Sequence, residues 1–274
     1  ILASFAAQRD LEQQLQKQYP LIEKGVVMPV ISAKTALSTL VKPDGTLRTL
    51  YKKEEATPVL IASLTKLMTA LVVLDQYNLN QKVTIDALAM NQEGEQGDLK
   101  LGQTLSVKNL LYITLMESSN KAAYALSEVM GTPEFIGLMN AYTRQLSLFN
   151  THFEDSTGLD YKSYSTASDL AKLSEYLIKN YPLFREIIGT KEYDVYLDGG
   201  TFHHKLINTN RLLGEAGIIG GKTGWTDNAK GCFMVLQHSP IQGNYIISVV
   251  LASEDRFSEM KTLLDWISVA YRWQ

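Results

Sequence analysis

The chain has 274 residues, a formal net charge of −3 and a sequence pI near 5.9, and 45% of its residues are hydrophobic. This balance is ordinary for a globular protein and gives no overall basic field, so we expect no nucleic-acid partner. The single cysteine, Cys232, excludes an intrachain disulfide and a thiolate zinc site. No uninterrupted apolar run reaches the length of about 18 residues that spans a bilayer, and we expect no C-terminal membrane helix.

The N-terminal third predicts a helix, a hairpin and a second helix. Residues 4–19 are rich in glutamine and helix formers and predict a polar helix that ends before Pro20. Residues 30–51 alternate apolar and small polar residues around the turn sequence Pro-Asp-Gly-Thr, which predicts a β-hairpin. Residues 63–77 are apolar on nearly every side, which is typical of a helix buried all round.

The rest of the chain returns from helices to strands. Three further helices are expected over residues 107–130, 132–148 and 166–182. Strand patterns follow at 222–226, 231–238 and 244–253, and an amphipathic helix is expected over 258–273.

Strands at both ends therefore bracket a helical middle, which predicts an α+β fold. Its antiparallel sheet would be formed by the N- and C-terminal segments and flanked by helices, with a mostly helical lobe inserted. We expect an N-terminal helical extension over 1–25 and one domain over 26–274. Within that domain the sheet lobe would cover about 26–60 and 190–274, and the helical lobe about 61–189.

The stretch GEAGIIGGKTG at 214–224 ends like a phosphate-binding loop. In that motif the first glycine lies six residues before the lysine, but here that position is Ala216. The residues after Lys222 favour a strand and a turn, whereas the motif needs a helix there. Nucleotide binding is therefore disfavoured, and no cofactor is expected.

The four histidines, His152, His203, His204 and His238, show no spacing typical of metal ligands. We interpret the His203–His204 pair as a surface or strand pair. No metal site is expected.

A serine and a lysine lie one helical turn apart at Ser63 and Lys66. Residues at i and i+3 share one helix face, so the lysine amine can reach the serine hydroxyl. Burial would disfavour the charged amine and suit it to act as a base, and the helix N-terminus would favour a developing oxyanion beside Ser63. A capping serine with a lysine that reaches solvent is the alternative interpretation.

Two further short motifs follow in order. Ser118-Ser119-Asn120 lies near a helix start or a tight junction between helices, and Lys222-Thr223-Gly224 lies on an expected strand. Each alone fits a cap or an ordinary strand. The order S-x-x-K, S-x-N, K-T-G is that of penicillin-binding proteins and serine β-lactamases.

With these motifs, the chain resembles the low-molecular-mass penicillin-binding proteins that act as serine-type D-alanyl-D-alanine carboxypeptidases and endopeptidases. The resemblance runs from about Ile31 to Trp266 and includes IASLTKLMTA, NTHFEDSTGLD, YSTASDLAKLSEYLI, NTNRLL and the closing LLDW. It implies a β-lactamase/transpeptidase-like fold, peptidoglycan stem peptides as substrate and β-lactams as covalent inhibitors. It also implies an extracytoplasmic location, where that substrate is found.

The resemblance implies a role for each motif residue. Ser63 would form an acyl-enzyme after Lys66 takes its proton, and Ser118, helped by Lys222, would pass a proton to the leaving amine. Asn120 would hold the substrate amide and keep Lys66 oriented. The remaining roles concern substrate binding: an oxyanion hole from the backbone N–H groups of Ser63 and Trp225, a place for the substrate backbone beside Gly224, and carboxylate binding by Thr223 and Arg256. Pairing with Glu259 is the alternative for Arg256.

Three functional alternatives remain open within and beside this family. A class A β-lactamase would need a glutamate for deacylation, and the segment FEDSTGLDYKS lacks the E-x-x-x-N arrangement of such enzymes. A non-catalytic penicillin or muropeptide sensor would use the cleft only to bind. Carboxypeptidase and endopeptidase activities share the same steps and are not separated by the sequence.

Overall fold

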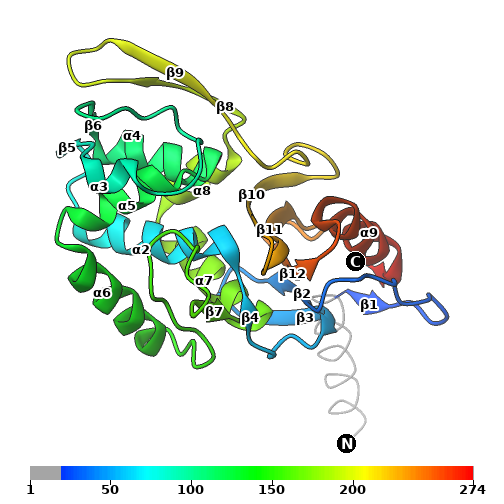
Figure 1. Cartoon of the computed structure of the whole chain (residues 1–274). Helices are drawn as coiled ribbons and strands as arrows, with labels where there is room; N and C mark the ends of the chain where they lie inside the picture. Colours follow the sequence, from blue (N-terminus) through cyan, green and yellow to red (C-terminus); the bar gives the residue numbers. More distant parts are fainter. Residues whose placement is uncertain (1–19, 274) are drawn as a thin grey trace, which may run out of the picture.

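The computed structural model describes residues 20–273 (Figure 1). The helix expected over residues 4–19 lies outside the described residues. Of the extension expected over 1–25, the described part contains no helix: β1 (Leu21–Ile22) pairs antiparallel with β13 (Tyr271–Arg272). The expected N-terminal extension therefore stays a prediction, because the helix expected within it lies outside residues 20–273.

A five-stranded antiparallel sheet joins the two ends of the chain, as predicted. Its order is β10-β11-β12-β2-β3. The strands are β2 (Thr35–Val41), β3 (Leu47–Lys53), β10 (Ile218–Thr226), β11 (Lys230–His238) and β12 (Tyr245–Ser253). The predicted hairpin is therefore confirmed as β2 and β3, and β10, which carries the Lys-Thr-Gly motif, is an edge strand.

Helices cover both faces of this sheet. Successive side chains of a strand point to opposite faces. In β12, Ile246 and Val250 join a core with α9 (Arg256–Ala270), while Ile247 and Val249 join the core of α7 (Ala167–Asn180). Burial on both sides explains why the strand is an almost continuous apolar run.

The nucleophile candidate lies where a short helical turn leads into a buried helix. The turn η1 (Ala62–Thr65) continues directly as α2 (Lys66–Gln76), whose residues from Lys66 to Val73 are all buried. This confirms the expected helix buried all round. Its neighbours in the same part of the molecule are α3 (Ala87–Met90), α4 (Val107–Tyr112), α5 (Asn120–Glu128) and α6 (Thr132–Gln145).

The expected single helix over 107–130 is interrupted. After α4, residues Ile113–Glu117 form one turn of π-helix, and Ser118 then adopts the left-handed region with φ of 66°. A residue in the left-handed region cannot continue a right-handed helix, so the helix ends at Ser118. A non-glycine residue adopts this conformation only rarely. The Ser119 side chain then accepts a hydrogen bond from the Ala122 N–H and caps the new helix α5.

The structure adds elements that the sequence reading did not contain. Pro182 is the first residue of α8 (Pro182–Gly189), which packs on β10, instead of the end of the preceding helix. A long hairpin follows, formed by β8 (Glu192–Tyr196) and β9 (Phe202–Ile207), and projects past β5 and β6 (Figure 1). The pairs β4 (Val59–Leu60) with β7 (Tyr164–Ser165) and β5 (Lys82–Thr84) with β6 (Thr104–Ser106) are short.

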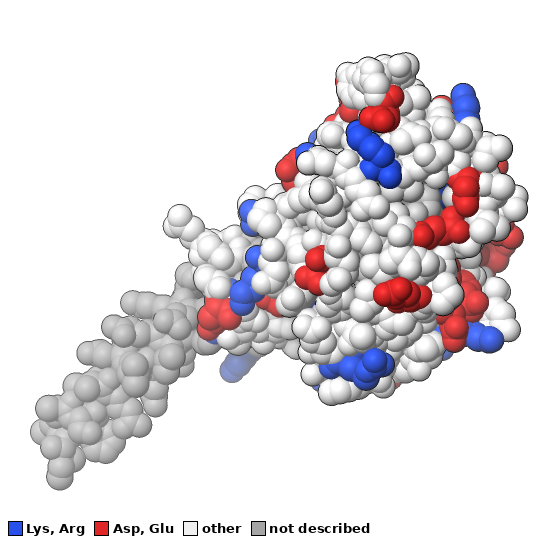
Figure 2. Space-filling model, turned by 90° about the vertical axis from the view of Figure 1, so that its left-hand side faces the viewer, with Lys and Arg blue, Asp and Glu red and all other residues white. Residues whose placement is uncertain are grey.

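The helices α7 and α8 fall within the expected helical lobe, about 61–189, and both pack against the sheet. The expected division into two lobes stays a prediction. Within residues 20–273 no helix is long and apolar enough to cross a membrane. On the face in Figure 2, basic and acidic side chains are interspersed, without an extended basic patch.

Candidate active site

Lys66 contacts three other polar groups of the site. Its side chain is fully buried, and its Nζ lies 3.0 Å from Ser63 Oγ, 2.7 Å from Asn120 Oδ1 and 2.7 Å from the Thr157 carbonyl oxygen. Three polar partners thus fix the amine one helical turn from the serine hydroxyl. The alternative of a lysine that reaches solvent is not what the structure contains.

Burial also changes the acidity of this amine. Desolvation lowers the pKa of Lys66 from 10.5 to about 7, and the charge of Asp155 opposes the shift. Near neutral pH the amine is therefore divided between its charged and neutral forms, which suits a group that accepts and returns a proton.

The second motif places two side chains toward Lys66 and Lys222. Asn120 is the first residue of α5; its Oδ1 faces Lys66, and its Nδ2 donates to the Glu93 carbonyl at 2.7 Å. Ser118, in its left-handed turn, lies with its Oγ 2.8 Å from Lys222 Nζ. The expected junction between helices is thus confirmed.

Lys222 enters the same cleft from the edge strand. Its side chain is 1% exposed, and its Nζ also donates to the Thr223 carbonyl at 2.8 Å. Burial lowers the pKa of Lys222 well below its usual value, and the positive charges of Lys66 and Arg256 act in the same direction. The two lysines therefore converge from a helix and a distant strand.

The motif residues surround one cavity of about 250 Å³. It is lined by Ser63, Gln96, Glu117, Ser118, Asn120, Gly158, Leu159, Thr209, Thr223, Gly224, Trp225, Thr226 and Arg256. Every site residue named from the sequence is in this list except Lys66 and Lys222, which lie buried behind Ser63, Asn120 and Ser118 and bond to them.

Arg256 does not pair with Glu259. That carboxylate instead accepts from the backbone N–H groups of Ser32 and Ala33 and from the Ser253 hydroxyl. The Arg256 guanidinium lies 4.7 Å from the centre of the Phe257 ring, and its buried Nε has no hydrogen-bond partner. A half-buried cation with an unused donor remains at the cavity wall.

Gly224 lets the edge strand approach the serine. A Cβ atom there would lie 2.9 Å from the Ser63 backbone nitrogen and 3.2 Å from the Ile61 carbonyl oxygen. The missing side chain thus makes room for the chain's own turn, and not only for a substrate as the sequence reading had it. The next residue, Trp225, is 56% exposed at the mouth of the cavity.

A loop that the sequence reading assigned no role supports the same turn. The Asp155 carboxylate accepts from the backbone N–H groups of Gly158 and Leu159, which presents the Thr157 carbonyl to Lys66. Gly158 has φ of 90°, and a Cβ there would meet the Ala62 carbonyl oxygen at 2.0 Å. An aspartate followed by Ser-Thr-Gly is the available sequence signal for such a turn.

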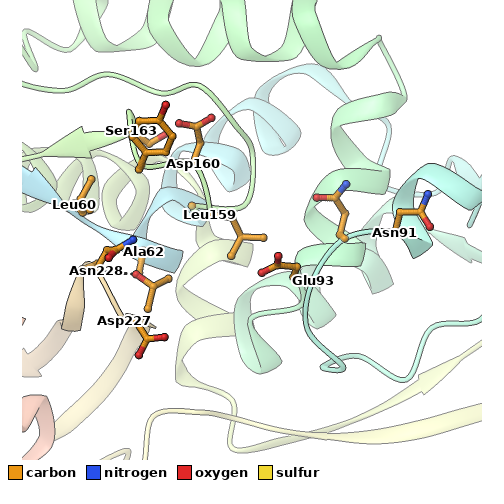
Figure 3. A pocket seen from close by; sticks show the side chains of 14 residues that line it. Leu60, Ala62, Asn91, Glu93, Leu159, Asp160, Ser163, Asp227 and Asn228 are labelled. Atoms are coloured by element: carbon orange, nitrogen blue, oxygen red, sulfur yellow. Dashed lines mark hydrogen bonds between the residues drawn. The ribbon is translucent and has the colours of Figure 1, made fainter.

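A second cavity of about 420 Å³ continues from the first, with which it shares Gly158, Leu159 and Thr226. Figure 3 shows its side chains, among them the carboxylates of Glu93, Asp160 and Asp227. The site thus opens into a groove longer than the space around Ser63. Within residues 20–273, no group of three or more His, Cys, Asp or Glu side chains is arranged to hold a metal ion.

Comparison with known proteins gives consistent matches. Residues 23–255 match the profile of peptidase family S11, D-alanyl-D-alanine carboxypeptidase. A D-alanyl-D-alanine carboxypeptidase of Streptomyces sp. strain K15 is 37% identical over 231 residues, 77% of this chain and 78% of the relative. A D-alanyl-D-alanine endopeptidase of Escherichia coli K12 is 34% identical over 76% of this chain and 69% of the relative.

Solved structures agree with the sequence matches. The crystal structure of the Streptomyces K15 DD-transpeptidase superposes with a TM-score of 0.78 at 33% identity, covering 89% of this chain and 99% of that chain. The fold and the site together define a serine-type peptidase. More narrowly, the chain belongs to the D-alanyl-D-alanine carboxypeptidase family, peptidase family S11.

Proposed function

We propose that the protein is a serine D,D-peptidase that cleaves peptidoglycan stem peptides ending in D-Ala-D-Ala through an acyl-enzyme on Ser63. The observation that carries this proposal is the 3.0 Å contact between the buried Lys66 amine and the Ser63 hydroxyl. Membership of the family supports the same reaction, since relatives at 37% and 34% identity are named for it.

In the first step Lys66 acts as the base. When neutral, its amine donates its two N–H groups to Asn120 Oδ1 and the Thr157 carbonyl, which leaves the lone pair directed at Ser63 Oγ. The Ser63 proton passes to Lys66 as the bond from Oγ to the penultimate D-Ala carbonyl carbon forms. Backbone N–H groups of Ser63 and Trp225 would hold the oxyanion, and the close approach of Gly224 to Ser63 supports that pairing.

In the second step the bond between the carbonyl carbon and the leaving nitrogen breaks. Ser118 gives its proton to that nitrogen and receives in return the proton that Lys66 took from Ser63, while Lys222 stabilises the serine oxygen at 2.8 Å. Water then gives a proton to Lys66 as its oxygen attacks the ester carbon, and that proton passes to Ser63 Oγ when the ester bond breaks. The terminal carboxylate of the substrate would bind Thr223 and Arg256, whose buried Nε is unused.

Mass spectrometry of the products from a defined muropeptide mixture tests this function, with Ser63→Ala as the control. The proposal expects loss of one D-Ala from pentapeptides with the native protein and no change with the variant. Cleavage of cross-linked dimers instead would identify an endopeptidase, as in the Escherichia coli relative. A protein that is acylated by penicillin but releases neither product would be a sensor, and the peptidase proposal would be wrong.

The same site would react with β-lactams as covalent inhibitors and release them slowly. The only carboxylate in the 155–159 turn, Asp155, is occupied by the backbone N–H groups of its own loop. Nitrocefin hydrolysis is the discriminating assay: many turnovers per second would indicate a β-lactamase. Because the proposed substrate is cell-wall peptide, we also place the protein outside the cytoplasm and regard residues 26–274 as its single catalytic domain.

A further inference from the structure

Glu117 lines the catalytic cavity immediately before Ser118, and its carboxylate is held from the β8–β9 hairpin. Its Oε2 lies 3.0 Å from His204 Nε2, and its Oε1 accepts the Ile207 N–H at 3.4 Å. Both Glu117 and His204 are less than one fifth exposed. The hairpin is therefore tied to the turn that gives Ser118 its left-handed conformation.

His203 extends this contact by one ring. Consecutive strand residues ordinarily point to opposite faces, but the register of β8 with β9 shifts at Val195 and Tyr196, and the two rings meet. Their Nδ1 atoms are 2.5 Å apart, and His203 Nε2 lies 3.1 Å from Gln103 Oε1. A chain of contacts thus runs from Gln103 to Glu117.

The hydrogen-bond partners at the two ends of this chain of contacts, Gln103 and Glu117, determine how many protons the pair of His203 and His204 carries. Gln103 Oε1 also accepts the Lys100 N–H at 2.8 Å, so it is the amide oxygen and an acceptor, and His203 Nε2 must carry a proton. His204 Nε2 must carry one as well, since its partner is a carboxylate. Two bare Nδ1 atoms in contact would repel, so one further proton lies between them.

We propose that His203 and His204 share one proton as a single positive charge, and that this charge holds Glu117 as the positioning residue of Ser118. Three N–H protons on two rings leave one net charge, which compensates the carboxylate. The inference rests on the proposed function, because Glu117 borders the cavity that would take the substrate's own carboxylate. Without the histidine charge, the two carboxylates would repel.

The surroundings of His203 oppose a charge on its own ring. Burial, followed by the charge of His204, lowers the pKa of His203, and Lys100 acts in the same direction while Asp98 opposes it. Val195 lies opposite His204 in the hairpin and is uncharged. Asp98 and Lys100 are thus the charged groups outside the pair that act on His203, and Glu117 contacts His204.

The kinetic test is the second-order rate of Ser63 acylation by a fluorescent penicillin. His204→Leu removes the donor to Glu117 and is expected to slow acylation about tenfold. His204→Gln keeps a neutral N–H donor but not the charge, so its rate is expected to stay within about threefold of the slow His204→Leu rate. His152→Leu is the matched control, because His152 makes a similar contact, 2.9 Å to Glu154, outside the cavity.

Equal rates for His204→Leu and the wild type would overturn the proposal, as would a His204→Gln variant as fast as the wild type. A wild type that is not acylated at all would instead refute the proposed function. The proton count has its own test in ¹⁵N spectra of labelled histidine at about pH 7. Three N–H protons on the pair are expected, and two would contradict the shared charge.

Glu117→Gln provides a second variant for the same spectra. It keeps an acceptor for His204 but removes the negative charge, so the shared proton should be lost at a lower pH than in the wild type. An unchanged titration of the pair would show that Glu117 does not stabilise its charge and would overturn the inference.

Discussion

At the scale of single residues, Lys66 combines burial with three fixed hydrogen bonds. Its folded pKa of about 7 lies below the ordinary 10.5, so the folded state binds fewer protons than the unfolded state between these values. Stability contributed by this group therefore rises as pH increases through that window. The same lowered pKa that reduces the stability of the folded state at low pH makes the amine available as a base near neutral pH.

The first prediction concerns this amine. Acylation of Ser63 should accelerate as pH rises through about 7, because only the neutral amine can accept the serine proton. Lys66→Arg keeps the positive charge but cannot lose its proton, so it should slow acylation at least about 100-fold at every pH. Stopped-flow penicillin binding measures both, and a pH-independent wild-type rate would contradict the assignment.

Gly158 gives a second prediction at this scale. Gly158→Ala should destabilise the protein by about 2 kcal/mol or more beyond Gly102→Ala. Both glycines have positive φ, but a Cβ at Gly158 would meet the Ala62 carbonyl oxygen at 2.0 Å, while one at Gly102 meets nothing within 4 Å. Urea unfolding gives the difference, and equal losses would show that the loop can move away from the Ser63 turn.

The proximity of the motif residues was predictable because the chemistry expected of them needs particular side chains at particular spacings. Ser63 and Lys66 share a helix face, and their partnership follows from that spacing. Thr157 was not predictable in the same way, since it contributes only a backbone carbonyl that any residue possesses. The contact between Glu117 and His204 joins residues that are 87 positions apart, and no local sequence pattern predicts it.

At the scale of elements, two serines cap neighbouring helices by the same kind of bond. Ser119 Oγ accepts from the Ala122 N–H at 3.2 Å at the start of α5, and Ser106 Oγ accepts from the Asn109 N–H at 3.1 Å at the start of α4. Of these two helices, only α5 carries a site residue, Asn120, in its first position. Removing each cap in turn therefore distinguishes an effect on helix stability from an effect on the geometry of the site.

Each cap removed by alanine substitution should cost about 1 kcal/mol of stability. Ser119→Ala should in addition slow acylation several-fold, because Asn120 orients the Lys66 amine at 2.7 Å, whereas Ser106→Ala should leave the rate unchanged. Thermal unfolding and penicillin-binding rates are measured on both variants. Equal rates in the two would show that α5 needs no cap to hold Asn120.

Long, strongly patterned elements were predicted well, and the exceptions have physical reasons. The hairpin β2–β3 and the buried α2 follow from periodicity in the sequence. The β8–β9 hairpin was missed because β9, with the sequence FHHKLI and one fully buried residue, lacks the alternation of apolar and polar residues that marks a strand. The break at Ser118 depends on one left-handed residue inside an apolar helical pattern.

At the scale of the whole molecule, Cys232 reports on global unfolding. It lies fully buried in β11, between the edge strand β10 and β12, and burial raises the pKa of its thiol to about 11. A thiol reagent should therefore label the native protein only at the rate of global unfolding, since the thiolate is the reactive form. Rapid labelling without denaturant would show that the sheet opens locally.

The sheet joins the two ends of the chain, and the three motifs meet only because this sheet closes against the helices. The central claim is that this meeting makes Ser63 the nucleophile. Intact-mass analysis after incubation with benzylpenicillin, followed by peptide mapping, tests it most directly. The account predicts one stable adduct on Ser63, absent in Ser63→Ala; an adduct on another residue, or none in the wild type, would contradict it.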